Sequence, residues 1–491
     1  MKPCFFPLSL LWLPFVAAAS PSPNVLFIMA DDFRSEIAAS GSAAITPHLD
    51  RLARSGVRFD RAYCQQAVCN PSRSSLLTGR RPDTLRIWNN STHFRELNPS
   101  VITLPQWFLQ NGYTTRCTGK IFHNWHTKEQ GDRRSWSAPE FLHYANHGDD
   151  APRVTGDLPP NLSTANIRAY GDGPICECRD VPDEAYYDGR IAAEAVKVLD
   201  AIHEQPFFLA VGFWKPHAPF NAPKKYWDLY ARDRLPPLHP DRPAGAPEIA
   251  FHESTEILGA GPGKVTPTPE QAAEWRHGYY ANVSYLDAQI GKVLDALDSH
   301  GLTQKTIILF VSDHGYHLGE HSLWGKTSTF EYDARVPLIV SGPDLRSNVR
   351  TDSLAELTDL FPTLVERCGL PAPDGLEGRS LLPILRDPGA KVHEAAFTQH
   401  PRPAYYDRQP PGRPAAMGCS VRLDRVRYTE WRDWATGEVI AKELYDAEND
   451  PQELHNAAGD SSLAGEERRA ARLLSERFPP HRDPERSKSS L

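Results

Sequence analysis

The chain has 491 residues and a formal net charge of −8, and no basic run or stripe stands out in it. This balance argues against a general nucleic-acid-binding protein. The length can bury a large core and predicts either two or more domains or one large domain with an appendage.

Residues 1–19 are predicted to be a secretory signal peptide. Lys2 precedes an apolar run that is broken by prolines and ends in the small residues Ala17, Ala18 and Ala19, as at a cleavage site. The run is too short and too rich in proline to span a membrane, and we expect no membrane span elsewhere. The protein is therefore expected to be secreted or periplasmic, or lysosomal if it comes from an animal.

Strands and helices alternate through the first three-quarters of the chain. The run from Asn24 to Met29 is apolar throughout, as expected of a strand buried on both faces of a parallel sheet. This βαβ alternation predicts a doubly wound α/β domain with a mostly parallel sheet flanked by helices. The other strands are expected at 113–118, 207–211 and 306–311, and helices at 46–56, 103–112 and 272–299.

The pattern changes near residue 396, where short antiparallel strands and one helix are predicted. We expect a catalytic domain at 22–392, a small C-terminal α+β domain at 393–480 and a disordered tail at 481–491. Two irregular stretches, 125–180 and 235–269, are expected to be surface excursions that form the walls of a pocket. The C-terminal strands are predicted at 421–423, 427–431 and 443–445, and the helix at 465–477.

Polar clusters follow three of the predicted strands. In open α/β sheets the ligand site lies outside the carboxyl ends of the strands, so these clusters should meet at one edge. The aspartates offer hard oxygen ligands that favour Ca²⁺ or Mg²⁺ over zinc. The clusters are Asp31 with Asp32, Lys215 with His217, and Asp313 with His314.

Cys69 lies at the predicted start of a short helix that ends before Gly79. Backbone N–H groups at a helix start favour anions, so we expect the pKa of this thiol to be lowered. Arg73 is one turn further on and could pair an oxyanion with its planar fork. Removal of the signal peptide would leave seven cysteines, and an odd number leaves at least one thiol unpaired. Cys176 and Cys178 could form a disulfide or remain loop thiols.

The run Cys69-Asn-Pro-Ser-Arg73 with Leu77-Thr-Gly-Arg80 resembles the sulfatase family signature, and Asp31-Asp32 and Asp313-His314-Gly315 strengthen the match. The similarity covers nearly the whole mature chain and is strongest to the iduronate-2-sulfatase branch, although Trp214 and Asn124-Trp125 depart from it. It implies an alkaline phosphatase-like fold. The stretches that carry the branch resemblance are 78–84, 119–123, 210–220, 284–287, 312–315, 318–321, 324–326 and 399–403.

The resemblance also implies a mechanism and its partners. A formylglycine-generating enzyme would oxidise Cys69 to formylglycine, whose hydrate attacks a sulfated oligosaccharide, with the 2-O-sulfate of a terminal uronic acid as the expected group. His217 would protonate the leaving oxygen and His123 would accept the proton that releases sulfate, although these two roles could be exchanged. One Ca²⁺ would be held by Asp31, Asp32, Cys69, Asp313 and His314, and sulfate charge would be met by Arg73, Lys120 and Lys326.

Three other functions stay open from the sequence. The chain could be a sulfatase for another sulfated polysaccharide, such as an algal one. It could be a phosphoester or phosphonate monoester hydrolase of the same superfamily. It could also be a glycan-binding protein on an inactive scaffold, although its polar set is complete.

Overall fold

The computed structural model describes residues 22–123, 130–141, 175–259, 264–408 and 410–479. The expected signal peptide and the expected C-terminal tail lie outside these residues. Within them, an eight-stranded sheet runs in the order β11-β2-β10-β7-β1-β5-β3, with β12 beside β2. Its strands are β1 (Asn24–Asp31), β2 (Gly56–Tyr63), β3 (Thr114–Gly119), β5 (Phe207–Pro216), β7 (Thr306–Ser312), β10 (Arg335–Ser341), β11 (Val349–Thr351) and β12 (Ala355–Glu356).

Four neighbouring strands, β3, β5, β1 and β7, are parallel, whereas β10 runs antiparallel to both β7 and β2. The side chains of β1 alternate between the two faces of the sheet. Leu26 and Ile28 belong to one core cluster, and Val25 and Phe27 to the other. Both faces of this strand are therefore covered, which explains why its sequence is apolar throughout.

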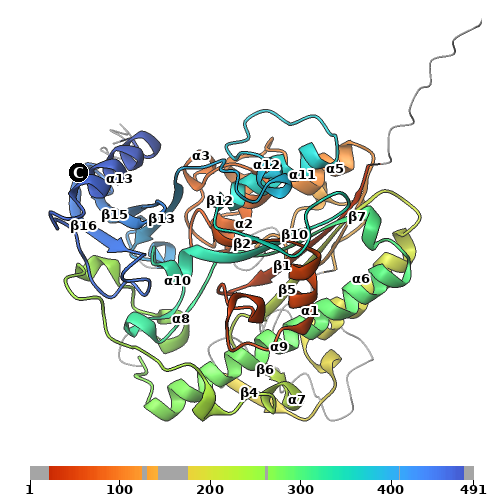
Figure 1. Ribbon diagram of the computed structural model, residues 1–491, viewed down its shortest axis with the longest axis horizontal. Coiled ribbons are helices and arrows are strands. Elements are labelled where there is room, and N and C mark those ends of the chain that lie inside the picture. Colours follow the sequence, from red (N-terminus) through yellow and green to blue (C-terminus); the bar gives the residue numbers. More distant parts are fainter. Residues whose placement is uncertain (1–21, 124–129, 142–174, 260–263, 409, 480–491) are drawn as a thin grey trace, which may run out of the picture.

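Helices cover both faces of the sheet (Figure 1). The long helix α9 (Pro269–Ser299) packs with α1 (Pro47–Ser55) and α6 (Tyr187–Ile202) on one face. It begins with a capping box, in which Thr268 Oγ1 accepts from the Gln271 backbone and Pro269 fills the first helical position. The other face carries α2 (Cys69–Thr78), α5 (Leu104–Gln110), α11 (Leu360–Arg367) and α12 (Leu382–Arg386).

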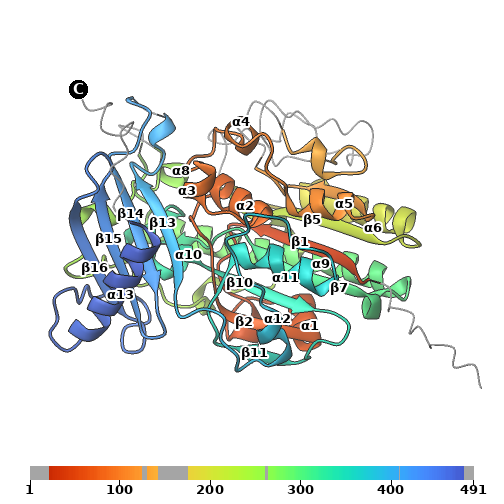
Figure 2. The same ribbon diagram turned by 90° about the horizontal axis from the view of Figure 1, so that it is seen from above.

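A second sheet lies to one side of the first (Figure 2). In the described residues it has four antiparallel strands in chain order, β13 (Ala396–Arg402), β14 (Ala416–Arg422), β15 (Val426–Asp433) and β16 (Val439–Asp446). Helix α13 (Ala464–Arg477) packs on β14 and β15. The predicted fold class, a mostly parallel α/β sheet with a small antiparallel α+β part, is confirmed.

Shorter elements connect these layers. They include β4 (Cys176–Arg179), which pairs with β6 (Phe220–Pro223), and the two-residue strands β8 (His317–Leu318) and β9 (Trp324–Gly325). The remaining α-helices of the described chain are α3 (Pro82–Leu85), α4 (Phe94–Leu97), α7 (Lys224–Trp227), α8 (Thr255–Leu258) and α10 (Glu331–Ala334). None of the helices in the described ranges is long and apolar enough to cross a membrane.

The predicted elements are present with shifted ends. The strand expected at 207–211 continues as β5 to Pro216, because the chain stays buried and paired beyond Gly212. The sequence analysis missed β2, β10 and β13. The expected excursion at 235–269 is in part packed rather than a surface loop, since Phe251, Ile257 and Leu258 are buried.

Candidate active site

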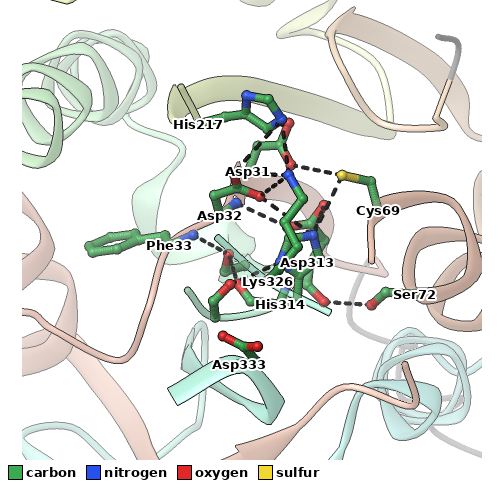
Figure 3. Close-up of polar contacts among 12 residues, drawn as sticks. Asp31, Asp32, Phe33, Cys69, Ser72, His217, Asp313, His314, Lys326 and Asp333 are labelled. Carbon is green, nitrogen blue, oxygen red and sulfur yellow. Dashed lines mark hydrogen bonds and ion pairs between the residues drawn. The ribbon is translucent and has the colours of Figure 1, made fainter. Parts of the chain in front are cut away.

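The site lies at the carboxyl ends of three adjacent parallel strands. Ala30 of β1 pairs with Ser312 of β7, and Asp31 pairs with Pro216 of β5, so the three strands end at the same edge. The first residue of α2, Cys69, faces this edge (Figure 3). The polar clusters therefore meet at one edge of the sheet, as expected, with the exception of Lys215. That residue donates instead to the backbone and to Asn221 of β6.

Four buried side chains form a group that could hold a metal ion. Asp31, Asp32, Cys69 and His314 each offer one ligand atom, and these atoms all lie within 4.8 Å of one another. Cys69 Sγ is 3.5 Å from Asp31 Oδ1 and 3.5 Å from His314 Nε2. Two carboxylates and one imidazole around a common point make a donor set that suits a hard divalent cation.

The tautomer of His314 fits such a role. Its Nδ1 lies 2.9 Å from the Gly315 carbonyl, which can only accept, so Nδ1 carries the proton. The lone pair of Nε2 then points at the group, 3.5 Å from Asp32 Oδ1. A backbone carbonyl that fixes the far nitrogen is the usual support of a metal-binding histidine.

The pKa values of the two neighbouring aspartates are shifted in opposite directions. Burial raises the pKa of Asp31, but Lys120, His217 and Arg73 together lower it well below its usual range. Burial raises the pKa of Asp32, and His217 and Lys326 lower it less than burial raises it. Asp32 Oδ1 accepts no hydrogen bond within the described residues, although Lys326 Nζ is 3.0 Å away. A bound cation is the partner that would hold this carboxylate ionised.

Asp313 lies at the border of the group. Its Oδ1 accepts from the backbone N–H groups of Asp32 (3.2 Å) and His314 (3.0 Å), and its Oδ2 lies 3.6 Å from His314 Nε2. Ser72 Oγ donates to its backbone carbonyl. These contacts attach the start of α2 to the end of β7, so that Asp313 joins the helix of Cys69 to this group of side chains.

Arg73 contacts groups of the protein itself. An arginine has five N–H donors, and every donor nitrogen of this fully buried guanidinium is engaged. Because these partners are protein groups, Arg73 holds two carboxylates of the site in this structure, and the expected pairing of its fork with a sulfate stays a prediction. Its partners are Asp313 Oδ2 (2.8 Å), Asp31 Oδ1 (3.5 Å) and the carbonyls of Lys120 (2.6 Å), Ile121 (3.0 Å) and Ala30 (3.3 Å).

The expected lowering of the Cys69 pKa is also wrong. Burial raises the pKa of this thiol well above its usual range, and the nearby Asp31 carboxylate raises it further. Lys120 and Lys326 lower this pKa, but by less than burial and Asp31 raise it. The thiol as such is a poor nucleophile, since it stays protonated.

Two lysines bring positive charge to the site. Lys120 Nζ donates to Asp31 Oδ2 and lies 4.4 Å from the ring centroid of Trp214. Lys326 Nζ lies 3.1 Å from Asp32 Oδ2 and 3.1 Å from His217 Nε2. Both lysines are buried, so their charges act in a medium that screens them weakly.

His217 follows β5 and points its Nε2 into the site. Its Nδ1 donates to the Ala218 carbonyl at 2.6 Å, which holds that side of the ring. Burial lowers the pKa of His217, but Asp32 and other acidic neighbours raise it above its ordinary value. A ring whose Nε2 holds a proton among carboxylates can donate that proton to a substrate oxygen.

The sequence analysis missed Glu256. It comes from α8, inside the irregular stretch 235–269, and its Oε1 is 2.7 Å from Lys326 Nζ and 3.2 Å from His217 Nε2. Asp32, His217 and Glu256 form a second group with ligand atoms within 4.8 Å. The Lys326 ammonium already contacts all three. No periodicity or motif surrounds Glu256, so no signal in the sequence could have identified it.

His123 is buried three residues after Lys120, where the described segment ends. Its role as the proton acceptor stays a prediction. The departures at Asn124 and Trp125 lie outside the described residues.

All seven cysteines of the described residues are unpaired. The disulfide alternative for Cys176 and Cys178 is therefore wrong, and both thiols lie in β4, where Cys176 is half-buried and Cys178 exposed. The part of the chain that the structure describes therefore has no disulfide bond to stabilise the fold.

Comparison with known proteins agrees with this geometry. The family model described as sulfatase matches residues 23–370, and the one described as N-sulphoglucosamine sulphohydrolase, C-terminal, matches residues 319–476. The chain belongs to the sulfatase family. This sulfatase is a sulfuric ester hydrolase, with Cys69 at the edge of the parallel sheet.

Its relatives include iduronate 2-sulfatase of Mus musculus, at 33% identity over 521 aligned residues, which cover 91% of this chain and 93% of the relative. A sulfatase of Formosa agariphila is 30% identical and covers 89% of this chain and 83% of its own length. Among solved structures, the phosphonate monoester hydrolase of Agrobacterium radiobacter superposes with a TM-score of 0.75 at 24% identity, over 94% of this chain and 96% of that chain. The structural likeness shows the alkaline phosphatase-like fold.

Proposed function

We propose that this sulfatase removes the 2-O-sulfate of a terminal uronic acid in a sulfated oligosaccharide, using a formylglycine made from Cys69 and one bound Ca²⁺. The observation that carries the proposal is the approach of Asp31 and His314 to Cys69 Sγ, each at 3.5 Å. It supports a cation next to the nucleophile. The uronic acid is supported by the 33% identity to iduronate 2-sulfatase.

The metal would be held by Asp31, Asp32 and His314, with Asp313 at the border and the modified residue 69 as a further ligand. Oxygen donors in this number favour Ca²⁺ or Mg²⁺. When bound there, the cation would neutralise sulfate charge and lower the pKa of the nucleophilic hydroxyl. The nucleophilic attack, the further charge stabilisation and the proton transfers would be carried out by side chains of the protein.

Cys69 Sγ stands where the hydroxyl oxygens of the formylglycine hydrate would be. A hydrate has two hydroxyls, so one can attack sulfur and the other allows release of sulfate by C–O cleavage. The high pKa of the buried thiol supports this conversion, because an unmodified Cys69 would stay protonated and unreactive. A formylglycine-generating enzyme would act on the chain before it folds, since Cys69 is buried in the folded protein.

The lysines and histidines would handle charge and protons. Lys120 and Lys326 would stabilise the charge that builds on the sulfuryl oxygens. His217 would give its Nε2 proton to the leaving sugar oxygen, and His123 would accept the proton that accompanies release of sulfate. Arg73 would contribute by holding Asp31 and Asp313.

Mass spectrometry of the peptide containing residue 69, from protein made in its native host, tests the nucleophile. We expect an aldehyde or its hydrate in place of the thiol. An unmodified thiol in fully active protein would overturn the mechanism. The Asp313→Ala variant should be inactive, and retained turnover would contradict the proposed site.

A substrate panel tests the specificity. We expect 2-O-sulfated uronate disaccharides of heparan and dermatan type to be better substrates than algal sulfated oligosaccharides. Dominant hydrolysis of nitrophenyl phosphates or phosphonates over nitrophenyl sulfate would favour the alternative hydrolase function. Binding of glycans without turnover of any ester would favour an inactive scaffold.

We also propose that residues 1–19 are removed on secretion and that the domains divide near residue 392. The N-terminal sequence of protein recovered from outside the cytoplasm tests the first statement. Limited proteolysis that releases a fragment ending near residue 392 tests the second.

A further inference from the structure

One carboxylate of the site has no part in the mechanism above. Glu256 comes from the stretch 235–269 rather than from the sheet edge, and it is not part of the group of four that includes Cys69. Its side chain is only 10% exposed. Because burying a carboxylate is costly, its contacts should account for its presence.

Both oxygens of Glu256 are engaged, and on opposite sides. Oε1 faces the site, 3.2 Å from His217 Nε2 and 2.7 Å from Lys326 Nζ. Oε2 accepts a hydrogen bond from Tyr405 Oη at 3.0 Å. The carboxylate plane is therefore fixed between the segment after β13 and the two cationic groups of the site.

Oε1 contacts Lys326 Nζ and His217 Nε2, and these two groups differ in whether a second carboxylate is close to them. Lys326 Nζ also lies within 3.1 Å of both oxygens of Asp32, so it keeps a close anionic partner without Glu256. His217 Nε2 has Asp32 only at 3.7 Å, which is beyond hydrogen-bond distance. Glu256 is thus the carboxylate within hydrogen-bond distance of His217 Nε2 in the described part of the chain.

We propose that Glu256 is a positioning residue that holds His217 Nε2 directed at the leaving-group oxygen. This inference rests on the proposed function, in which His217 is the acid. In that step a hydroxyl oxygen of residue 69 that has already lost its proton to water forms a bond to sulfur while the bond between sulfur and the leaving oxygen breaks. The leaving oxygen keeps the electron pair and takes the proton from His217 Nε2, and the imidazole becomes neutral. A ring that turns away cannot make this transfer.

The step makes a prediction about leaving groups. A sugar alkoxide leaves poorly and needs the proton, whereas a nitrophenolate leaves unprotonated. Glu256→Gln keeps the shape and the acceptor oxygen but loses the negative charge that orients an Nε2–H. We expect its kcat on a sulfated uronate disaccharide to fall by about 100-fold, as for loss of a general acid, and on nitrophenyl sulfate by less than about 3-fold.

Matched variants separate positioning from folding. Glu253→Gln removes the same charge three residues away at an exposed position, and both kcat values should be unchanged. Glu256→Asp should recover part of the sugar-ester activity, because it restores the charge. Tyr405→Phe removes only the outer hydrogen bond and should lower the sugar-ester kcat less than Glu256→Gln does. Thermal unfolding of each variant shows whether it is folded.

The outcomes are distinguishable. An equal loss on both esters, or no loss on the sugar ester in a folded Glu256→Gln protein, would overturn the inference and leave the proposed function intact. If the wild-type protein fails to hydrolyse either sulfate ester, the proposed function fails first. A rise in KM with unchanged kcat would make Glu256 a substrate-binding group and would contradict the positioning role.

Discussion

Nε of Arg73 lies 2.8 Å from Oδ2 of Asp313, and both side chains are fully shielded from solvent. The same guanidinium reaches Asp31 and three backbone carbonyls, so it joins β1, the segment after β3 and β7 at one point. An arginine inside the signature run therefore organises the carboxylates next to Cys69. This arrangement can be tested through stability, independently of activity.

Arg73→Met should destabilise the fold strongly. It leaves Asp313 and Asp31 buried with one cationic partner fewer, and removing one member of a buried ion pair costs about 3–5 kcal/mol. Arg51→Met is the control, because its pair with Asp295 at 2.6 Å is about half exposed and such pairs contribute about 1 kcal/mol or less. Urea unfolding of both variants measures the difference. Equal free energies of unfolding would contradict a buried network at Arg73.

Calcium should stabilise the protein through His314. A ligand that binds only the folded state at 100 times its dissociation constant adds about 2.7 kcal/mol to the free energy of unfolding. We expect added Ca²⁺ to raise the unfolding temperature of the chelator-treated protein, and His314→Ala to lose most of this rise.

His393→Ala is the control for calcium binding elsewhere. His393 belongs to another group with Glu356 and Asp359, but its Nε2 is already 2.9 Å from Asp359 Oδ2 and Glu356 pairs with Arg81. The calcium response should survive in this variant. If the calcium response were lost in His393→Ala and kept in His314→Ala, the metal would be bound by the group that contains His393.

The sequence predicts those site residues that directly follow a predicted strand. Asp31, Asp32, Asp313 and His314 follow continuous apolar runs, and parallel strands deliver such residues to one edge. The start of α2 at Cys69 is predicted by Pro71 and Gly79, and Gly79 has a positive φ of 64° at the helix end. These features depend on local pattern, so one sequence is enough to find them.

Other features depend on tertiary packing and could not be predicted. Burial reverses the expected pKa of Cys69, because desolvation exceeds the effect of the helix start. The direction of the Arg73 guanidinium depends on carbonyls after β3, far away in the sequence. Glu256 reaches the site from a stretch with no period, and only the folded chain brings it to His217.

Glu443 should make the stability of the C-terminal sheet depend on pH. Burial raises its pKa to about 7, although Tyr445 Oη and Trp431 Nε1 donate to it. A raised pKa in the folded state means that the stabilisation is complete below the unfolded value of about 4.5 and is lost as the pH rises through about 7. Urea unfolding should show a free energy that falls between about pH 4.5 and about pH 7.

Glu443→Gln should flatten this fall, because the amide keeps an acceptor and cannot ionise. Glu438→Gln is the control, since Glu438 is exposed just before β16 and should leave the pH dependence unchanged. If both variants follow the wild-type curve, another group is responsible for it.

Alkylation of the free thiols should show whether residue 69 is chemically modified or is only protected by burial. A reductant should leave the unfolding temperature unchanged, because no disulfide links the seven cysteines of the described residues. Iodoacetamide should label native protein first at Cys178, which is exposed, and this fast reaction should disappear in Cys178→Ser. Cys64 and Cys117 are buried with raised pKa values and should react only after unfolding.

In unfolded protein from the native host, the peptide containing residue 69 should still resist alkylation, because an aldehyde has no thiol to label. A residue 69 that is alkylated like Cys64 after unfolding would show that burial alone protected it. A reductant that lowers the unfolding temperature would instead contradict the unpaired state of the other cysteines.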